Sequence, residues 1–468
     1  MKKFVAALLT AVMAMSLLCI SAFAADTYTI TAPSNGHTYE VYQIFTGDLN
    51  DGVLSNVEAG KNFKGTDAAA AAEALDGVTG TNAAKLSAIT PYVDLTGDPY
   101  TTVKDGSVSV PAGYYLVKDV DGSQNGKDDA YTLYIVAVVG NTSITPKTDT
   151  PEVEKKVKDT NDSTGATTGW QDSADYDIGD SVPYQITATM GDLSAYQTYY
   201  VEFTDTMSAG LTYNNDAKVT LDGKDVTSSF TVTCSNNVMT AVCGDVIVLG
   251  AAEDSQIVVT YTCTLNENAV IGAQGNANTV KLTYSNNPNN SGNGTDKPGD
   301  TGETPEDKNV VFTYKVVANK ITEDKQALTG ASFKLEKVDA KGSVIKDLGT
   351  IDGTQLSTFT WTGIDDGNYV ITETVTPAGY NSIDPISFTV TASHDADSAD
   401  PQLTELSGGE LFTGDVATGA VTADIVNESG ATLPTTGGMG TTLFYVIGAV
   451  LVLGAGLVLI TRKRMAND

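Results

Sequence analysis

Three polar side chains fall on the apolar face of strands predicted in the middle of the chain. Lys155 alternates with valines, Asp205 alternates with Val and Phe, and Asn278 alternates with Val, Leu and Tyr. Alternate side chains of a strand point to the same face of a sheet. The pattern therefore predicts that an amine, a carboxyl group and an amide all point into a core.

The same set of groups recurs nearer the C-terminus. Lys320 alternates with Val and Ala, Glu373 alternates with Tyr and Ile, and Asn427 alternates with Ile. In both sets the lysine lies in the first predicted strand of its domain and the asparagine lies in the last. This shared order suggests shared chemistry.

Burial of such groups favours a reaction between them. Loss of solvation disfavours charge, so it lowers the pKa of a lysine from about 10.4 and raises that of a carboxylic acid. The neutral amine is then a nucleophile, and the protonated acid can donate a hydrogen bond that makes the amide carbon electrophilic. Attack followed by loss of ammonia would leave a Lys–Asn isopeptide bond. No cofactor is needed, because folding aligns the groups.

Each set also has an interpretation without a reaction. A strand lysine can extend along an apolar surface to reach solvent or a carboxylate, and asparagine is common in turns and bulges. One set taken alone favours this structural interpretation. Two sets with the same order along the chain favour the reaction.

The length and composition of the chain predict a mainly β protein of two or three domains. A length of 468 residues sets the domain number, and richness in Gly, Thr, Val and Tyr favours strands. The Ala-rich run 67–75 is the one convincing helix. The expected parts are a signal peptide at 1–24, an N-terminal domain at 25–147, a second domain at 151–284, a polar linker at 285–309 and a third domain at 310–429.

Both ends of the sequence indicate export. Basic residues, an apolar core and Ala-Phe-Ala at 22–24 are typical of a signal peptide. Near the other end, an apolar run from 443 to 460 predicts a transmembrane helix over 442–461, with a basic cytoplasmic tail at 462–468. The formal net charge of −31 argues against nucleic acid and anionic membranes as partners.

A pentapeptide precedes the predicted helix, formed by Leu433, Pro434, Thr435, Thr436 and Gly437. The order of pentapeptide, apolar span and basic tail resembles the cell-wall sorting signal of Gram-positive surface proteins. A sortase cuts the LPxTG motif of that signal between Thr and Gly. The alternative is a plain single-span anchor behind a chance Pro-Thr-Gly segment.

The cysteines and histidines give no sign of a metal site. Cys234 and Cys243 flank a predicted hairpin and could form a disulfide, which leaves Cys263 unexplained. His37 and His394 stand apart from any nucleophile motif, so we expect solvent-exposed or hydrogen-bonded structural roles for both. We therefore predict no metal and no cofactor.

The predicted third domain resembles the collagen-adhesin B-type domain of Gram-positive surface proteins. The resemblance rests on Leu-x-Gly-Ala-x-Phe-x-Leu at 328–335 and on Tyr-Val-Ile-Thr-Glu-Thr-Val-Thr-Pro-Ala-Gly-Tyr at 369–380. In that family these motifs flank a Lys–Asn isopeptide bond promoted by a glutamate. The resemblance implies these roles for Lys320, Asn427 and Glu373.

The predicted second domain resembles the isopeptide-forming domain of fimbrial proteins. The likeness rests on Val-Glu-Lys-Lys-Val at 153–157, on the motifs that begin at 177 and 203, and on Asn-Thr-Val-x-Leu-x-Tyr-Ser-Asn from 278. It implies a bond between Lys155 and Asn278, promoted by Asp205. Lys156 and Asn276 are close enough in sequence to remain alternatives.

With Gly-His-Thr-Tyr-Glu-Val-Tyr-Gln-Ile-Phe at 36–45, the resemblance to a sortase-assembled major pilin covers essentially the whole chain. It implies three tandem Ig-like β-sandwich domains and no enzymatic activity beyond the formation of the chain's own bonds. The implied location is the cell wall or pilus of a Gram-positive bacterium. The implied partners are class C and housekeeping sortases, other copies of the chain, peptidoglycan, and tip and basal pilins. Membrane contact is implied only through the C-terminal helix before sorting.

Polymerisation also needs an amine. In that family it is a lysine in a short motif, often Tyr-Pro-Lys, at the end of the first domain. Here Thr-Pro-Lys ends at Lys147, so we expect Thr436 to be joined to Lys147, with 155–158 as alternative lysines. The competing function is a monomeric wall-anchored adhesin with an isopeptide-stabilised stalk, which would bind its ligand through the first domain. The sequence leaves the host ligand and the identity of the sortase open.

Overall fold

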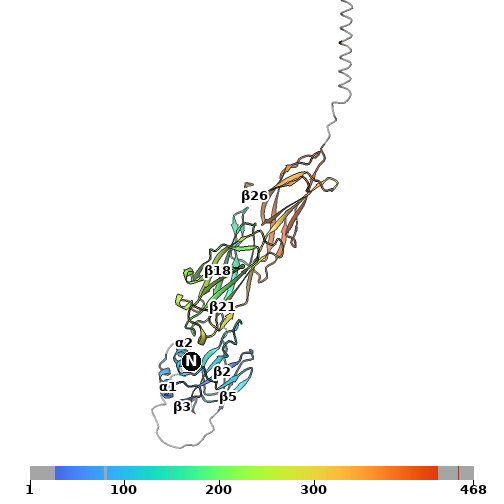
Figure 1. The fold of residues 1–468 in the computed structure, drawn as a ribbon. Coiled ribbons are helices and arrows are strands. Elements are labelled where there is room, and N and C mark those ends of the chain that lie inside the picture. The colour runs from blue at the N-terminus through green and yellow to red at the C-terminus, as the bar shows by residue number, and fades with distance from the viewer. Residues whose placement is uncertain (1–26, 79–81, 148, 431–451, 453–468) are drawn as a thin grey trace, which may run out of the picture.

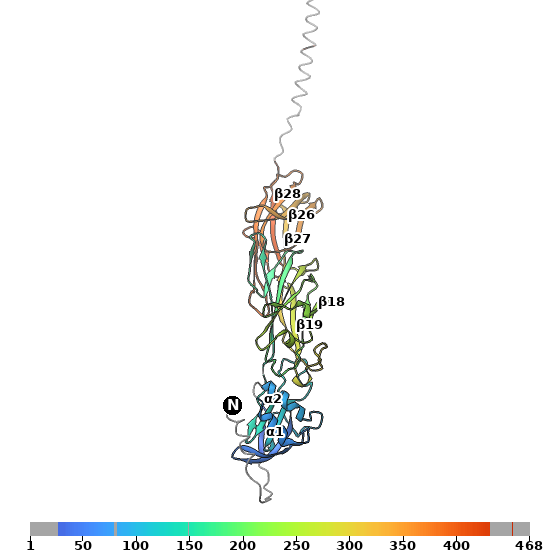
Figure 2. The same ribbon diagram turned by 90° about the vertical axis from the view of Figure 1, so that its left-hand side faces the viewer.

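Three β-rich domains follow one another along an elongated molecule (Figure 1, Figure 2). The structure, a computed structural model, describes residues 27–78, 82–147, 149–430 and 452, and of residues 82–84 only the backbone. None of the helices in this described part is long and apolar enough to cross a bilayer. Apart from residue 452, these predictions lie outside the described residues: the signal peptide 1–24, the sorting motif 433–437, the helix 442–461 and the tail 462–468.

The first domain contains a five-stranded sheet in the order β3-β2-β6-β7, with β4 beside β2, and a three-stranded sheet in the order β5-β1-β8. Asp67 caps the predicted helix, because its carboxylate accepts the backbone N–H of Ala70 over 2.9 Å. A second helix, which the sequence analysis did not predict, follows it. The elements are β1 (Thr27–Thr31), β2 (Tyr39–Asn50), β3 (Val53–Ala59), α1 (Ala68–Asp76), α2 (Asn82–Ile89), η1 (Thr90–Tyr92), β4 (Thr101–Val103), β5 (Ser107–Pro111), β6 (Gly113–Asp119), β7 (Leu133–Val138) and β8 (Thr142–Ser143).

The second domain packs a six-stranded sheet, β17-β16-β20-β13-β9 with β15, against a seven-stranded sheet, β12-β23-β21-β14-β19-β18 with β22. Regular alternation of buried side chains along β13, β20 and β21 builds the core between them. The elements are β9 (Glu152–Val157), β10 (Thr160–Asn161), β11 (Ala166–Thr167), β12 (Ser173–Asp175), β13 (Ser181–Thr189), β14 (Val201–Met207), β15 (Leu211–Tyr213), β16 (Lys218–Leu221), β17 (Lys224–Asp225), η2 (Thr227–Ser229), β18 (Thr231–Ser235), β19 (Val238–Cys243), η3 (Ile247–Leu249), β20 (Gln256–Leu265), β21 (Asn276–Ser285), η4 (Pro288–Asn290), β22 (Thr301–Glu303) and β23 (Asp307–Phe312).

The third domain packs a four-stranded sheet, β27-β24-β32-β31, against a five-stranded sheet, β26-β25-β28-β29-β30. Its first and last strands, β24 and β32, run parallel as direct neighbours. The elements are β24 (Tyr314–Thr322), β25 (Ala331–Val338), β26 (Val344–Gly353), β27 (Thr358–Ile364), β28 (Gly367–Val375), β29 (Ile386–His394), β30 (Leu403–Ser407), β31 (Thr413–Asp415) and β32 (Ala420–Asn427).

The structure differs from the linker expected at 285–309. This segment contains η4 and β22, and it also contains the start of β23. Both β22 and β23 pair with β21. Asn287 is fully buried because its amide donates to Asp121 Oδ1 over 3.0 Å and to Asp300 Oδ2 over 2.8 Å. Polar side chains that bond to one another in this way can be buried at low cost. The segment is therefore packed structure that also contacts the first domain, while the exact domain limits stay predictions.

The predicted hairpin around the cysteines is present as β18 and β19, but the disulfide is not. Cys234 stands opposite Met239, away from Cys243, and all three cysteines among the described residues are free thiols. Cys263 is buried in the core, where its Sγ lies 3.4 Å from Met207 Sδ. Its role is therefore packing.

Candidate functional site

The first predicted set of groups meets between the two sheets of the second domain. Lys155 lies on β9, and Asp205 lies on β14 of the opposite sheet. Both side chains are fully buried, and Lys155 Nζ contacts Asp205 Oδ2 as an ion pair. Asn278 is also fully buried, on β21 beside β14. The sheet pairing thus brings all three residues into one part of the core.

The hydroxyl group of Tyr261, a residue that the sequence analysis missed, connects these three groups. It accepts from Lys155 Nζ over 2.5 Å and from Asn278 Nδ2 over 3.0 Å. It donates to Asp205 Oδ2 over 2.7 Å. Strict alternation along β20 points this tyrosine into the core, and that signal in the sequence could have revealed it.

Two oxygen atoms of this cluster have no hydrogen-bond partner among the described residues. They are Asp205 Oδ1 and Asn278 Oδ1, and both can only accept while the acid is ionised. A proton on Asp205 would turn one of them into a donor. Burial lowers the pKa of Lys155, although the Asp205 carboxylate opposes that shift. The cluster therefore contains a weakly basic amine. It also contains an acid and an amide whose free oxygen atoms could share one proton if the acid were protonated.

The two residues that remained as alternatives in the sequence lie apart from this cluster. Lys156 places its Nζ 2.7 Å from Asp172 Oδ1 and is partly exposed. Asn276 is buried, but its amide bonds to backbone groups of two other segments. Neither residue contacts Tyr261.

The second predicted set meets in the third domain. Lys320 on β24 and Asn427 on β32 lie on neighbouring parallel strands, and Lys320 Nζ contacts Asn427 Oδ1 directly. Glu373 on β28 of the opposite sheet accepts from Asn427 Nδ2 over 2.9 Å. Its Oε1 lies 3.7 Å from Lys320 Nζ, and both of these ionisable side chains are fully buried. The amine, the amide and the acid therefore touch one another in pairs.

The surroundings of Lys320 make its neutral amine easier to form. Burial lowers its pKa to about 8, although Glu373 opposes the shift. Its Nζ lies 5.7 Å from the centre of the Phe333 ring and donates to Ile425 O over 3.1 Å. A larger fraction of this amine is neutral near pH 7 than for a free lysine, whose pKa is about 10.4.

Two further lysines are buried, and both are surrounded by carboxylates. Lys118 Nζ lies 2.7 Å from Glu40 and 2.9 Å from Asp121. Lys337 Nζ contacts Asp365 and lies 3.3 Å from Asp177 Oδ2. Neither Nζ hydrogen-bonds to an amide side chain among the described residues. Alternation with apolar neighbours could have revealed both lysines. What sets Lys155 and Lys320 apart is a nearby asparagine, which Lys320 contacts directly and which Lys155 reaches through the hydroxyl group of Tyr261.

Lys337 is also held in its charged form. Burial alone disfavours the ammonium group, but Asp365 and Asp177 outweigh it and raise the pKa of Lys337. A charged amine has no free electron pair for attack. Lys337 therefore forms an ion-pair network, which includes Asp177 from the second domain and Asp365 from the third.

Lys147, the expected linkage residue, lies in a cleft between the first and second domains. The cleft measures about 280 Å³ and is lined by Tyr131 and Pro146 from one side and by Tyr196 and Tyr284 from the other. The side chain of Lys147 is 31% exposed, and its Nζ lies 3.7 Å from Asp192 Oδ2. The amine is therefore accessible, while Thr436 lies outside the described residues.

Three family models match successive parts of the chain. Residues 178–288 match the Cna-B-like domain of the Gram-positive pilin backbone subunit 2. Residues 314–402 match a prealbumin-like fold domain, and residues 425–467 match the LPXTG cell wall anchor motif. The Cna-B-like description thus falls on the second domain, whereas the sequence resemblance assigned the B type to the third.

One protein sequence and one solved structure are similar to the chain over most of their length. The trypsin-resistant surface T6 protein of Streptococcus pyogenes serotype M6 is 26% identical over 426 residues, which cover 76% of this chain and 74% of that protein. The solved T6 backbone pilin of serotype M6 Streptococcus pyogenes, described as a modular three-domain structure, superposes with a TM-score of 0.57 and 20% identity. The superposition covers 88% of this chain and 100% of that chain, which shows the shared fold.

These matches confirm the predicted family, the anchor motif and the surface location. They also set aside a catalytic function, because backbone pilins are structural proteins. The chain belongs to the Gram-positive backbone pilins with an LPXTG cell wall anchor, the subunits of sortase-assembled surface pili.

Proposed function

We propose that this backbone pilin contains two internal covalent links and is joined to its neighbour by a third. The internal links are isopeptide bonds from Lys155 to Asn278 and from Lys320 to Asn427. The link between subunits joins Thr436 of one copy to Lys147 of the next. The observation that carries the proposal is that each buried lysine with a lowered pKa meets an acid and an asparagine. Lys320 contacts its asparagine directly, and Lys155 is linked to its asparagine through the hydroxyl group of Tyr261.

In the third domain the reaction follows from the contacts of one amide. Neutral Lys320 Nζ attacks Asn427 Cγ, and Glu373, hydrogen-bonded to Asn427 Nδ2, transfers a proton to that nitrogen. The bond from Cγ to Nδ2 breaks and ammonia leaves. Lys320 loses a proton as the new amide forms, and that proton restores the acid. The groups are already in contact, so little ordering remains to be done before reaction.

In the second domain Tyr261 orients the reacting groups. Its hydroxyl group bonds to Lys155, Asp205 and Asn278 at once, which limits the motion of all three. Asp205, when protonated, can donate to the amide oxygen of Asn278 and increase the positive character of Cγ. The two oxygen atoms without partners are those that such a hydrogen bond would satisfy.

The link between subunits is an exchange of amide bonds. The peptide bond from Thr436 to Gly437 breaks, and the Thr436 carbonyl carbon bonds to Lys147 Nζ of another copy. The lysine gives up a proton, and the released Gly437 amine takes one. We assign this polymerisation to a class C sortase and the final attachment to peptidoglycan to a housekeeping sortase. The helix over 442–461 would hold the chain in the membrane until sorting, and tip and basal pilins would complete the fibre.

The three bonds together define the path of a pulling force. Force would enter at Lys147 and leave at Thr436, so the first domain would lie beside the path. Within the second domain it would cross from β9 to β21, and within the third from β24 to β32. Covalent bonds at these places would relieve the hydrogen-bonded strands of the load. This is the use we propose for three tandem Ig-like sandwiches in a pilus shaft.

The internal bonds can be tested by intact mass. Protein produced without sortase is expected to be lighter than its sequence by two molecules of ammonia. Glu373→Gln and Asp205→Asn should each reduce the loss to one, because each removes the proton donor of one cluster. Lys337→Met is the matched control, since it removes a buried lysine without an amide partner, and both losses should persist. An unchanged loss of two in both acid variants would contradict the assigned roles.

A further inference from the structure

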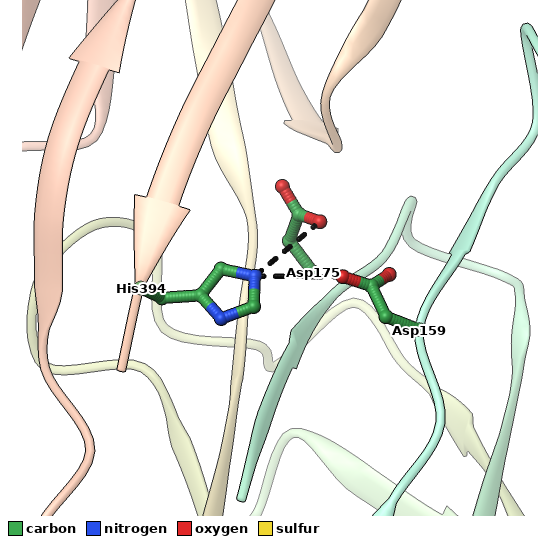
Figure 3. Close-up of side chains that lie close together, drawn as sticks. All are labelled: Asp159, Asp175 and His394. Carbon is green, nitrogen blue, oxygen red and sulfur yellow. Dashed lines mark ion pairs between the residues drawn. The ribbon is translucent and has the colours of Figure 1, made fainter. Parts of the chain in front are cut away.

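A histidine of the third domain faces two carboxylates of the second domain (Figure 3). His394 ends β29, Asp175 ends β12, and Asp159 lies just after β9. His394 Nε2 lies 3.4 Å from Asp159 Oδ2 and 3.9 Å from Asp175 Oδ1. The His394 side chain is 9% exposed and that of Asp175 3%. The three side chains therefore converge in a nearly dry place between two domains.

The hydrogen bonds of Ser173 fix the orientation and the tautomer of this histidine. Ser173 Oγ lies 2.5 Å from the backbone oxygen of Asp395, which can only accept, so its one proton is used there. The same Oγ lies 2.7 Å from His394 Nδ1 and must therefore accept from it. In the neutral imidazole the proton is thus on Nδ1, and the free electron pair of Nε2 points towards the carboxylates.

The site has an excess of negative charge. Among the ion pairs of the described residues, His394 is the one cationic partner of Asp159 and of Asp175. The hydroxyl group of Tyr314 is fully buried beside Asp175, and it makes no hydrogen bond of normal geometry among the described residues. The site therefore contains more carboxylate groups than positively charged groups.

A second acidic cluster nearby shows what a filled site looks like. Its carboxylates belong to Asp162, Asp177, Asp180 and Asp365. Lys337 and Lys346 place their ammonium groups among these oxygens. Two ammonium groups of the chain itself already occupy that cluster, whereas no lysine or arginine of the described residues forms an ion pair with the aspartates at His394.

We propose that Asp159, Asp175 and His394 bind one divalent cation between the second and third domains. One imidazole nitrogen with carboxylate oxygens is a donor set suited to zinc. Two ligand atoms on a tetrahedral zinc ion with bonds of about 2.0 to 2.15 Å are separated by roughly 3.3 to 3.5 Å. The separations at Nε2 are longer than typical hydrogen bonds. The 3.4 Å to Asp159 falls within this range, and the 3.9 Å to Asp175 is longer, so the ion would draw Asp175 inward. Ser173 then acts as the outer partner that holds the histidine ligand.

Such an ion would join two domains that lie on the proposed path of force. The second domain would supply two ligands and the third domain one, so the ion would resist bending between them. The nearby backbone contact from Asp172 N to Ala396 O, 2.9 Å long, already brings these segments together. The inference does not depend on either isopeptide bond.

Titration of the full chain with ZnCl₂, followed by calorimetry, tests this site. We expect one zinc ion per chain for the wild-type protein and a weaker response to CaCl₂, because calcium prefers ligand sets made of oxygen. His394→Gln should abolish zinc binding. Ser173→Ala should weaken it about 10-fold to 100-fold, as is usual for an outer partner of a metal ligand.

The chain provides a matched control in its other histidine. His37 is buried and also faces two carboxylates, Asp119 and Asp129. It belongs to no group of three ligand atoms among the described residues, so His37→Gln should leave zinc binding unchanged. An absence of zinc binding by the wild-type chain would overturn the proposal. Undiminished binding by both His394→Gln and Ser173→Ala would overturn it as well.

Discussion

Lys147→Ala is expected to abolish the ladder of high-molecular-weight species that we predict for the wild-type pilin on a denaturing gel. The reason is that Lys147 supplies the proposed amine for every link between subunits, so its loss stops growth at the first step. The chain should still fold, because its Nζ makes one partly exposed ion pair, with Asp192. Such pairs contribute about 0 to 1 kcal/mol. Immunoblots of cell-wall extracts from a sortase-containing Gram-positive host would measure the ladder.

Two further variants test whether the ladder requires the Lys147 amine itself, only a positive charge at that place, or a lysine at another position. Lys147→Arg keeps the positive charge near Asp192, but its guanidinium group stays protonated, so the ladder should also be lost. Lys158→Ala removes one of the alternative lysines, which stacks over Trp170 at 4.7 Å, and should leave the ladder intact. A ladder that persists in both Lys147 variants and disappears in Lys158→Ala would move the linkage to Lys158.

Loss of the internal bond in the third domain is expected to lower its free energy of unfolding by about 4 to 5 kcal/mol. This figure is the one for a disulfide that closes a loop of about 100 residues, and it arises from restriction of the unfolded chain. Lys320→Met would remove the bond and keep most of the apolar packing. Denaturant unfolding, followed by the fluorescence of Trp361 in the core of that domain, would give the difference.

Glu373→Gln controls for the altered packing at Lys320. It keeps the lysine and the size of the acid, but it removes the proton donor, so it should lower stability by a similar amount. Lys337→Met removes a different buried lysine. Any change that it causes in the free energy of unfolding should occur without a change in the number of covalent bonds. If Lys320→Met and wild type unfold at the same denaturant concentration, no bond restricts the unfolded chain.

Period-two alternation predicted much of the candidate site. Lys155, Asp205, Lys320 and Asn427 are all buried, as their phase with apolar neighbours indicated. Alternation predicts burial because one face of each strand is covered by a second sheet. Whether a residue is buried therefore depends on which of the two faces its side chain points to. Which buried lysine meets an amide could not be read in this way, because that depends on which strands pair within a sheet and which sheets pack together.

Contacts between distant segments were the ones that the sequence did not reveal. The polar segment at 285–309 has the composition of a solvated linker, yet Asn287 is buried because carboxylates from two places accept its hydrogen bonds. His394 alternates with buried residues of β29, but the two aspartates that face it belong to another domain. Domain docking supplies these partners, and strand periodicity contains no information about docking.

The most direct test of the covalent account is tandem mass spectrometry of proteolytic peptides from purified pili. We predict three branched peptides, which join Lys155 to Asn278, Lys320 to Asn427, and Lys147 to Thr436 of another copy. Each of the two branched peptides that contain an internal bond should be lighter by one ammonia than the sum of its two component peptides. Linear peptides in which Lys155, Lys320 and Lys147 are all unmodified would contradict the account.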